Sequence, residues 1–396
     1  MTTESTPAGE LHRHCPVCGS GRGEVLRRLD YILFDDLDIS GHFRLVACAA
    51  CGFVFNELTD SGKALAAYYR DNEHYLFSNT GGTGGSGPRE AARYRRLEQR
   101  LRERITPDSA ILDVGCGKGG WLRYLASRGY RALMGLEASA ACRRDIQASL
   151  GVPVAERIQE LPLDQGRPAV VVLSHVLEHV PYPAQFLGEL VDASAADALF
   201  CLEVPNTPGL LQGETPWRDF YFEHINHFDA HHLRTVARLA GIEPIGMELW
   251  PFLPGEGDSA ACVFLLCRRT CSDPSPLVMD SSLREALVAR LPLRPLSIEQ
   301  EERILRDNRA LAMWGVSQYA QLILGMHPRI LERVAALFDA SPAKIGRRVA
   351  GIEIQPPAAI AEQPQPPLLL LPHSDYTPWM VEQLERMHYG GGYAFA

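Results

Sequence analysis

Short apolar runs alternate with stretches of helical spacing through the middle of the chain. Residues 110–112 are apolar and lead into a glycine-rich turn, and residues 121–126 beyond it have the spacing of a helix. A second run covers 130–136. A third, 169–173, is apolar at every position, as expected of a parallel strand buried on both faces. Two later segments predict further strands: 199–204 and 261–266. The pattern predicts an α/β fold with a Rossmann-like sheet.

The turn after the first strand carries three regularly spaced glycines. Residues 113–119 are Asp-Val-Gly-Cys-Gly-Lys-Gly. Because glycine lacks Cβ and tolerates positive φ, such a turn lets the backbone approach a ligand at the head of a helix. A P-loop is not predicted, since the Gly-Lys-Ser/Thr ending is missing. The spacing resembles the first motif of class I methyltransferases that depend on S-adenosylmethionine (SAM), and this resemblance covers residues 90–270.

Glu137 stands at the end of the second predicted strand. A carboxylate there can accept hydrogen bonds from both ribose hydroxyls of a nucleoside, or it can simply begin a helix, where it suits the helix dipole. The order of strand, glycine turn, helix, strand and acid favours ribose binding. The residues predicted to contact the cofactor are Asp113, Gly115, Gly117, Gly119, Glu137, Ser174 and His175.

Four of the ten cysteines form two Cys-x-x-Cys-Gly pairs, Cys15 with Cys18 and Cys48 with Cys51. Two such knuckles can offer four thiolates to zinc, although unrelated buried cysteines are the alternative. Four thiolates leave no open coordination position, so the predicted zinc is structural. The remaining cysteines are expected to be reduced and mostly buried.

Composition narrows the class of protein. The chain has 396 residues, 46% of them apolar, and a net charge of −9, which argues against nonspecific binding of nucleic acid. The polar N-terminus does not have the pattern of a signal peptide, and the apolar runs are too short to span a bilayer. These features predict a cytoplasmic protein with no membrane partner.

Changes in pattern along the chain predict four segments. We expect a zinc-binding module at 12–60, a helical linker or lid at 61–104, the SAM-binding core at 105–270 and a small C-terminal Rossmann-like domain at 296–396. The glycine-rich stretch 81–87 suits either a plain linker or a lid. Helices are predicted at 88–104 and 298–310, and C-terminal strands at 312–316, 335–339 and 368–371.

Titratable side chains gather after two strands of the predicted core, where open parallel sheets bind ligands. Segment 174–181 contains His175, Glu178 and His179, and segment 219–228 contains Tyr221, Glu223, His224 and His227. Histidine suits proton removal near neutral pH. The alternatives are a helix start for His175 and His179, and packing in the core for His227.

The complete layout resembles the C-methyltransferases of deoxysugar biosynthesis, a family of natural-product enzymes. The resemblance rests on the two cysteine knuckles, the turn 113–119, the sequence His-Val-Pro-Tyr that begins at His179, and the sequence Tyr-Phe-Glu-His that begins at Tyr221. It implies a class I methyltransferase sheet with an N-terminal zinc ribbon and a small C-terminal α/β domain. It also implies that Tyr221, Glu223, His224, His179 and an upstream tyrosine, placed at Tyr75, are catalytic.

The same resemblance implies a reaction on a nucleotide-linked 4-keto sugar. His224 would remove the proton beside the ketone, while Tyr221 and His179 would donate hydrogen bonds to the oxyanion of the enolate. The C-terminal domain departs from the family, because the turn 314–320 has no lysine.

Three functions therefore compete at this stage. The first is a sugar C-methyltransferase. The second is an O-, N- or C-methyltransferase acting on another small natural product. The third is a zinc-ribbon binding protein with a degenerate methyltransferase fold, against which the intact glycine turn and Glu137 argue.

Overall fold

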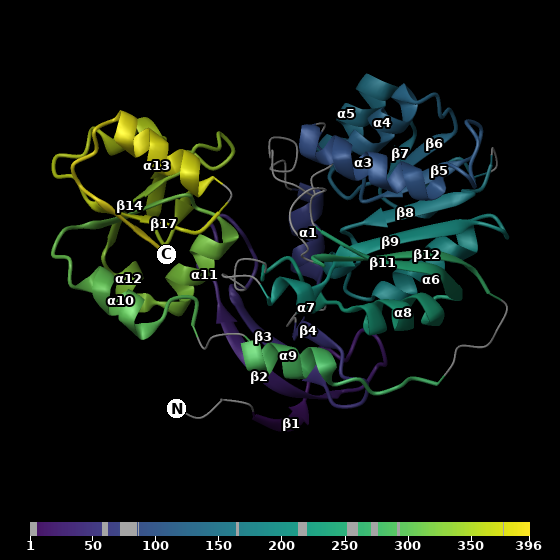
Figure 1. The fold of residues 1–396 in the computed structure, drawn as a ribbon, viewed down its shortest axis with the longest axis horizontal. Coiled ribbons are helices and arrows are strands. Elements are labelled where there is room, and N and C mark those ends of the chain that lie inside the picture. The colour runs from purple at the N-terminus through teal and green to yellow at the C-terminus, as the bar shows by residue number, and fades with distance from the viewer. Residues whose placement is uncertain are drawn as a thin grey trace.

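The computed structural model describes residues 6–57, 62–71, 85, 87–163, 166–212, 220–251, 260–270, 276–290, 294–374 and 376–396. They form two lobes that meet at an N-terminal sheet (Figure 1). Each lobe is built on a sheet of its own.

The larger lobe contains a seven-stranded sheet in the order β11-β12-β9-β8-β5-β6-β7. Its strands are β5 (Ile111–Val114), β6 (Leu133–Leu136), β7 (Val154–Ala155), β8 (Val170–Ser174), β9 (Leu199–Pro205), β11 (Ile242–Trp250) and β12 (Cys262–Arg269). Strand β12 is antiparallel to both of its neighbours, β11 and β9, and the remaining neighbouring pairs are parallel. All four residues of both β5 and β6 are buried, because helices cover both faces of the sheet. The predicted fold class is confirmed.

Helices of the larger lobe follow the strands along the chain. They are α3 (Pro88–Leu101), α4 (Gly120–Ser127), α5 (Ala140–Leu150), α6 (Pro183–Ala193), α7 (Thr207–Leu210) and α8 (Ala230–Leu239), with short 3-10 turns η1 (Ile158–Glu160) and η3 (Leu177–His179). Helix α1 (Lys63–Asp71) precedes them and lies between the two lobes (Figure 1).

The N-terminal sheet is antiparallel, in the order β1-β2-β3-β4-β10. Its strands are β1 (Thr6–Glu10), β2 (Arg22–Asp30), β3 (His42–Cys48), β4 (Val54–Glu57) and β10 (Asn226–His227). Strand β10 belongs to the segment predicted as the SAM-binding core, so the chain returns to the N-terminal sheet far along the sequence. The four predicted segment limits remain predictions about independent units.

The smaller lobe contains a six-stranded sheet in the order β15-β16-β14-β13-β17-β18. Helix α9 (Ser282–Arg290) precedes this lobe and lies against the N-terminal sheet (Figure 1). The elements of the lobe are α10 (Ile298–Leu305), β13 (Leu311–Trp314), α11 (Gln318–Met326), α12 (Pro328–Leu331), β14 (Val334–Phe338), β15 (Arg348–Val349), β16 (Ile352–Gln355), η5 (Pro357–Ile360), β17 (Leu368–Leu371), α13 (Thr377–Arg386) and β18 (Tyr393–Phe395). The strands are parallel except for the β15–β16 pair.

The N-terminal sheet buries side chains on both of its faces. Phe43 and Leu45 of β3 belong to a core that includes Met313 of the smaller lobe. Val46 of β3 and Phe55 of β4 belong to a second core, shared with the central sheet of the larger lobe. Because successive side chains of a strand point to opposite faces, one sheet packs against both lobes.

A buried arginine joins the N-terminal sheet to the larger lobe. The guanidinium of Arg13 donates to the carbonyl oxygen of Asn56 (2.9 Å), to that of Pro181 and to Asn226 Oδ1 (3.2 Å). Asn226 in turn donates to the carbonyl oxygens of Leu177 (2.9 Å) and Val180 (2.7 Å). Strand β10 pairs with β4 beside this arginine. The junction therefore holds the segments after β8 and before α8 in one arrangement.

Some predicted elements were too long. The strand predicted at 130–136 begins only at Leu133, because Gly129 adopts a φ of 91° after α4 and Arg131 N–H bonds back to Pro107. The helix predicted at 298–310 ends at Leu305 because the Asp307 carboxylate bonds the N–H of Arg309 (3.0 Å) and closes a turn. Strand β11 was not predicted. Seven of its nine residues are half-buried or exposed, and only its two end residues are buried, so it lacks the apolar run of a central strand.

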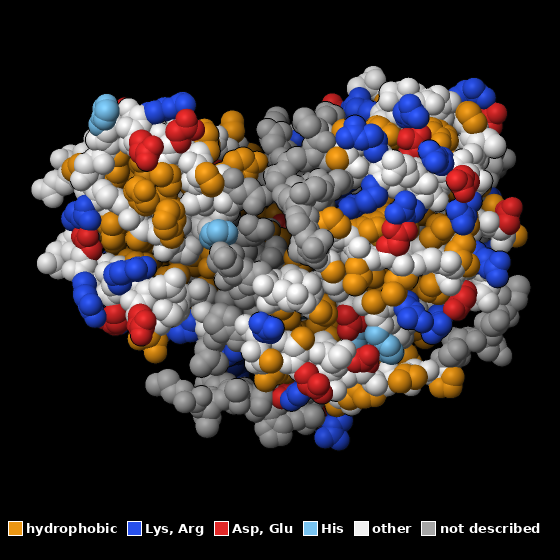
Figure 2. Space-filling model, in the orientation of Figure 1, with side chains coloured by type: hydrophobic (Ala, Val, Ile, Leu, Met, Phe, Trp, Pro, Cys, Tyr) orange, Lys and Arg blue, Asp and Glu red, His pale blue; other side chains and the backbone are white. Residues whose placement is uncertain are grey.

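Charged side chains of both signs are spread over the surface. On the face drawn in Figure 2, Lys and Arg are interspersed with Asp and Glu on both lobes. Among the described residues, none of the helices combines the length and the apolar character that a bilayer span requires.

We expect Arg13→Ala to lower the free energy of unfolding by about 3 kcal/mol, because it leaves buried carbonyl groups without their charged donor. Urea denaturation of the full chain measures this. The matched control is Arg131→Ala, whose ion pair with Asp108 is exposed at 68% and 73%, and which should change stability by less than about 1 kcal/mol. Equal losses in both variants would refute the role assigned to Arg13.

Candidate functional site

The glycine turn after β5 has the backbone that the sequence predicted. Gly115, Gly117 and Gly119 have φ values of 66°, 53° and 74°. A Cβ at Gly115 would lie 2.7 Å from Val176 Cγ2, and one at Gly119 would lie 2.8 Å from Ile146 Cγ1. Larger residues are therefore excluded here by both conformation and space.

Glu137 lies beside this turn at the end of β6. Its carboxylate accepts the N–H groups of Gly117 and Ser139, each at 2.8 Å. Burial raises the pKa of Glu137, and those two backbone N–H groups oppose the shift. Burial and the charge of Glu137 together raise the pKa of Asp113 well above its usual range. A glycine turn after β5 with the carboxylate of Glu137 at the end of β6 fits a nucleoside-containing cofactor such as SAM.

A buried ionic network occupies the ends of β8 and β9. Glu203 accepts hydrogen bonds from Ser174 Oγ (2.5 Å), from Arg93 (3.3 Å) and from Arg96 (3.3 Å). Burial alone would raise the pKa of Glu203, but Arg93, His175, Ser174 and Arg96 outweigh it and lower that pKa to about 2. The predicted cofactor residue Ser174 is thus held by the protein's own charges.

His175 follows Ser174 with a φ of 57°, which is rare outside glycine. Its Nδ1 lies 3.1 Å from Glu178 Oε1 and its Nε2 lies 3.8 Å from Cys262 Sγ. Burial and Arg93 lower the pKa of His175, but the bonds with Cys262 and Glu178 prevail and raise it to about 10. His175 thus belongs to the same network as Glu203, 4.0 Å from its carboxylate.

The residues of the two titratable segments meet in one place. The ring of His224 lies 4.9 Å from the ring of His179 and 4.7 Å from that of Tyr221, nearly perpendicular to both. The His224 carbonyl oxygen accepts from Asn56 Nδ2 (3.1 Å), so the N-terminal sheet holds this segment. His227 lies apart from this group. It stacks on Phe220 and bonds Asn56 Oδ1 (3.2 Å), and burial lowers its pKa to about 3.

The protonation of His179 follows from its neighbours. Nδ1 lies 3.0 Å from the carbonyl oxygen of Glu223 and 2.8 Å from the hydroxyl of Tyr69. Because a carbonyl oxygen only accepts, the neutral imidazole carries its hydrogen on Nδ1 and its lone pair on Nε2. Donation from Nε2 therefore requires the imidazolium form.

Helix α1 contributes two tyrosines that the sequence did not single out. Tyr69 contacts His179, and Tyr68 donates to Glu223 Oε1 at 3.0 Å. The same oxygen accepts from Gln318 Nε2 at 2.5 Å, so the first turn of α11 reaches this site from the smaller lobe. The signal available in the sequence was the helical pattern that places two adjacent tyrosines before the core. Tyr75, the predicted upstream tyrosine, lies outside the described residues.

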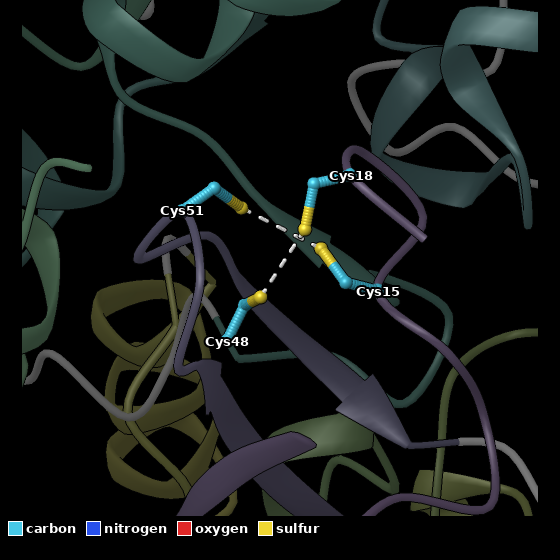
Figure 3. A group of neighbouring side chains, drawn as sticks. All are labelled: Cys15, Cys18, Cys48 and Cys51. Carbon is cyan, nitrogen blue, oxygen red and sulfur yellow. Dashed lines mark hydrogen bonds between the residues drawn. The ribbon is translucent and has the colours of Figure 1, made fainter. Parts of the chain in front are cut away.

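The four knuckle cysteines converge at the end of the N-terminal sheet (Figure 3). Their sulfur atoms all lie within 4.8 Å of one another, with 3.6 Å between Cys15 and Cys51 and 3.4 Å between Cys18 and Cys48. Tetrahedral zinc with bonds of about 2.3 Å requires sulfur separations of about 3.8 Å. The cluster therefore has dimensions compatible with zinc.

The smaller lobe repeats the geometry of the Glu137 corner. Asp339, at the end of β14, accepts the N–H groups of Val316 (2.8 Å) and Ser341 (2.9 Å). Here, however, Lys344 Nζ bonds both the Asp339 carboxylate (3.0 Å) and the Val316 carbonyl oxygen (3.0 Å). A lysine from outside the turn 314–320 thus neutralises the acid of this second corner.

Comparison with known proteins identifies one domain. Residues 88–245 match the family model described as a methyltransferase domain. A probable chloroplastic tocopherol O-methyltransferase of Oryza sativa subsp. japonica is 25% identical, over 35% of this chain and 42% of the relative. The chain thus spans less than half the length of that relative.

Solved structures resemble part of the chain. One is a SAM-dependent methyltransferase from Mesorhizobium loti, with 16% identity, a TM-score of 0.35 and coverage of 43% of this chain and 96% of that one. Another is the magnesium protoporphyrin IX methyltransferase of Synechocystis PCC 6803 with bound SAH, with 15% identity, a TM-score of 0.36 and coverage of 46% and 84%. The domain match over 88–245 shows that the chain carries a methyltransferase domain, which implies SAM as cofactor.

Acid titration tests the Glu203 network. The folded-state pKa of Glu203, about 2, lies below its unfolded value, so the carboxylate stabilises the fold above about pH 4.3 and this contribution is lost as the pH falls through about 2. We expect Glu203→Gln to lose on the order of 3 kcal/mol at neutral pH, and the difference from wild type to shrink toward about pH 2.

Urea unfolding at several pH values measures this difference. Glu248→Gln is the matched control, because its pair with Arg100 is exposed at 37% and 39% and should contribute much less. A pH-independent effect of Glu203→Gln would contradict the assigned charge.

Proposed function

We propose that the protein is a SAM-dependent methyltransferase that methylates a carbon beside the ketone of a nucleotide-linked deoxysugar. The observation that carries the proposal is the meeting of His224, Tyr221 and His179 at the carboxyl ends of β8 and β9, in the domain that contains the glycine turn. A sugar-methylating enzyme of this kind needs one base and at least one oxyanion donor in contact with the substrate.

Each residue has a separate role in this proposal. His224 removes the proton beside the ketone, and Tyr221 donates a hydrogen bond to the oxygen that becomes negative. His179 does the same in its imidazolium form, since the Glu223 carbonyl oxygen holds the Nδ1 hydrogen. Glu223 accepts hydrogen bonds from Tyr68 and Gln318, and these bonds fix the segment that carries Tyr221 and His224.

The cofactor is held by the corner between β5 and β6. We assign binding of the cofactor ribose to Glu137. The backbone of Gly115, Gly117 and Gly119 approaches the cofactor closely, and Asp113, Ser174 and His175 provide polar groups around it. When bound, SAM supplies an electrophilic methyl group. The assignment is supported by the positive φ values of the turn and by the position of Glu137 beside it.

Zinc is proposed as a structural ion at Cys15, Cys18, Cys48 and Cys51. The support is the sulfur spacing and the fourfold thiol set, which leaves no position for substrate. Its proposed contribution is to the N-terminal sheet, which carries Arg13 and Asn56 to the site.

A second function has one observation in its favour. The relative with 25% identity is named as an O-methyltransferase. On a hydroxylated substrate, His224 would remove the hydroxyl proton instead, and the methyl group would be accepted by oxygen.

Glu137→Ala should weaken SAM binding by on the order of 1 to 3 kcal/mol, from lost charged hydrogen bonds. Calorimetry with the full chain measures this, and a thermal melt shows whether the loss of the Gly117 and Ser139 bonds disturbs the fold. Glu302→Ala, at an exposed pair with Arg329 in the smaller lobe, should bind SAM as the wild type does. Unchanged affinity in folded Glu137→Ala would remove Glu137 from the cofactor site.

His224→Ala should bind SAM normally but lose about a hundredfold or more in turnover, because a general base is removed. The measurement is transfer of labelled methyl from SAM to nucleotide 4-keto sugars, with His231→Ala, a half-buried histidine on α8, as control. The variant should also lose solvent exchange of the proton beside the ketone.

The two readouts separate the alternatives. Solvent exchange at the normal rate in His224→Ala would show that another group, such as His179, removes the proton beside the ketone. Transfer to a hydroxyl oxygen in the wild type would establish the O-methyltransferase instead of the sugar C-methyltransferase.

A further inference from the structure

Glu178 is a buried carboxylate for which the proposed reaction has no use. The residue is 1% exposed and lies in the short turn η3 between His175 and His179. Its Oε1 is 3.1 Å from His175 Nδ1 and 4.0 Å from His179 Nε2. Its Oε2 is buried and has no hydrogen-bond partner among the described residues. A buried carboxylate oxygen without a hydrogen-bond partner is energetically unfavourable, so this unpaired oxygen indicates that Glu178 binds a ligand.

Two imidazoles face the same carboxylate. One ligand atom each from Glu178, His179 and His224 lie within 4.8 Å of one another. For His179 this atom is Nε2, because Nδ1 contacts the Glu223 carbonyl oxygen. Holding the far nitrogen of an imidazole by a carbonyl group is the arrangement that orients histidine ligands in metal sites.

The neighbouring Glu203 cluster shows what distinguishes this group. Glu203, His175 and Cys262 are also close together, but Arg93 and Arg96 already neutralise Glu203. A cation would be repelled there. In the described part of the chain no arginine or lysine pairs with Glu178, whose ion-pair partners are His175 and His179.

We propose that Glu178, His179 and His224 bind a divalent transition metal ion. Two imidazoles and one carboxylate suit zinc, cobalt, nickel or iron, and three protein ligands leave a coordination position open. His175, whose Nδ1 lies 3.1 Å from Glu178 Oε1, orients the carboxylate. The ion and the substrate proton compete for His224, so the bound metal inhibits the enzyme; this last step rests on the proposed function, whereas metal binding does not.

Cobalt titration of the purified full-length protein tests the site without any substrate. After metal removal, Co²⁺ should bind twice. Binding at the four cysteines gives thiolate-to-cobalt charge-transfer bands, and the second event gives only visible d–d bands, because its ligands are nitrogen and oxygen.

Glu178→Gln and His224→Ala should each weaken the second event by at least about tenfold. The control is His231→Ala on α8, whose imidazole lies 3.7 Å from the Asp280 carboxylate; it should bind as the wild type does. Retention of the thiolate bands shows that each variant is folded.

One cobalt ion per chain at saturation would overturn the proposal, as would equal second-site affinity in wild type, Glu178→Gln and His224→Ala. Inhibition is measured separately, as loss of methyl transfer on addition of Zn²⁺ and its return on chelation. If cobalt binds twice but Zn²⁺ does not inhibit, the metal site stands and the role of His224 as base is rejected.

Discussion

The hydrogen bonds of Arg13 are the interaction on which the site depends. This buried guanidinium joins Asn56 of the N-terminal sheet to Pro181 after β8 and to Asn226 before α8. The segments that carry His179 and His224 belong to different crossovers of the central sheet, and Asn226 joins them directly through the carbonyl oxygens of Leu177 and Val180. The N-terminal sheet holds the second segment as well, because β4 pairs with β10 and Asn56 donates to the His224 carbonyl oxygen. A cysteine-bound metal at the far end of that sheet would therefore support catalysis through geometry alone.

The turn beside Glu137 and the turn beside Asp339 have similar backbone hydrogen bonds, but Lys344 contacts only the second. Glu137 and Asp339 each accept two backbone N–H groups at the end of a second parallel strand. At the first corner no lysine bonds the carboxylate in the described part of the chain. At the second, Lys344 does so and also bonds the turn. A hydroxylated ligand at the second corner would have to compete with a tethered cation, so the same backbone geometry provides acceptors at only one of the two corners.

Much of the fold followed from local patterns, because buried parallel strands and glycine turns have strong local signatures. The central strands, the turn 113–119 and Glu137 are of this kind. Strand β10 and the contacts of Arg13 with Pro181 and Asn226 were not predictable, since they join residues more than 150 positions apart. Tyr68, Tyr69 and Gln318 were missed for the same reason: their contacts with His179 and Glu223 come from elements outside the core. Pairing across such distances has no local period in the sequence.

Two buried carboxylates near the site, Glu203 and Glu178, differ in how fully the protein's own side chains pair with them. Around Glu203, Arg93, Arg96 and Ser174 supply hydrogen bonds to a single carboxylate, so this group is already paired by the protein and its pKa is low. Around Glu178, one carboxylate oxygen has no hydrogen-bond partner among the described residues, and a carboxylate oxygen lies within 4.8 Å of ring nitrogens of His179 and His224. Polar atoms that the protein does not satisfy are those that a ligand can satisfy. His175 joins the two groups, since its Nδ1 lies 3.1 Å from Glu178 Oε1 and its Nε2 lies 4.0 Å from Glu203 Oε1.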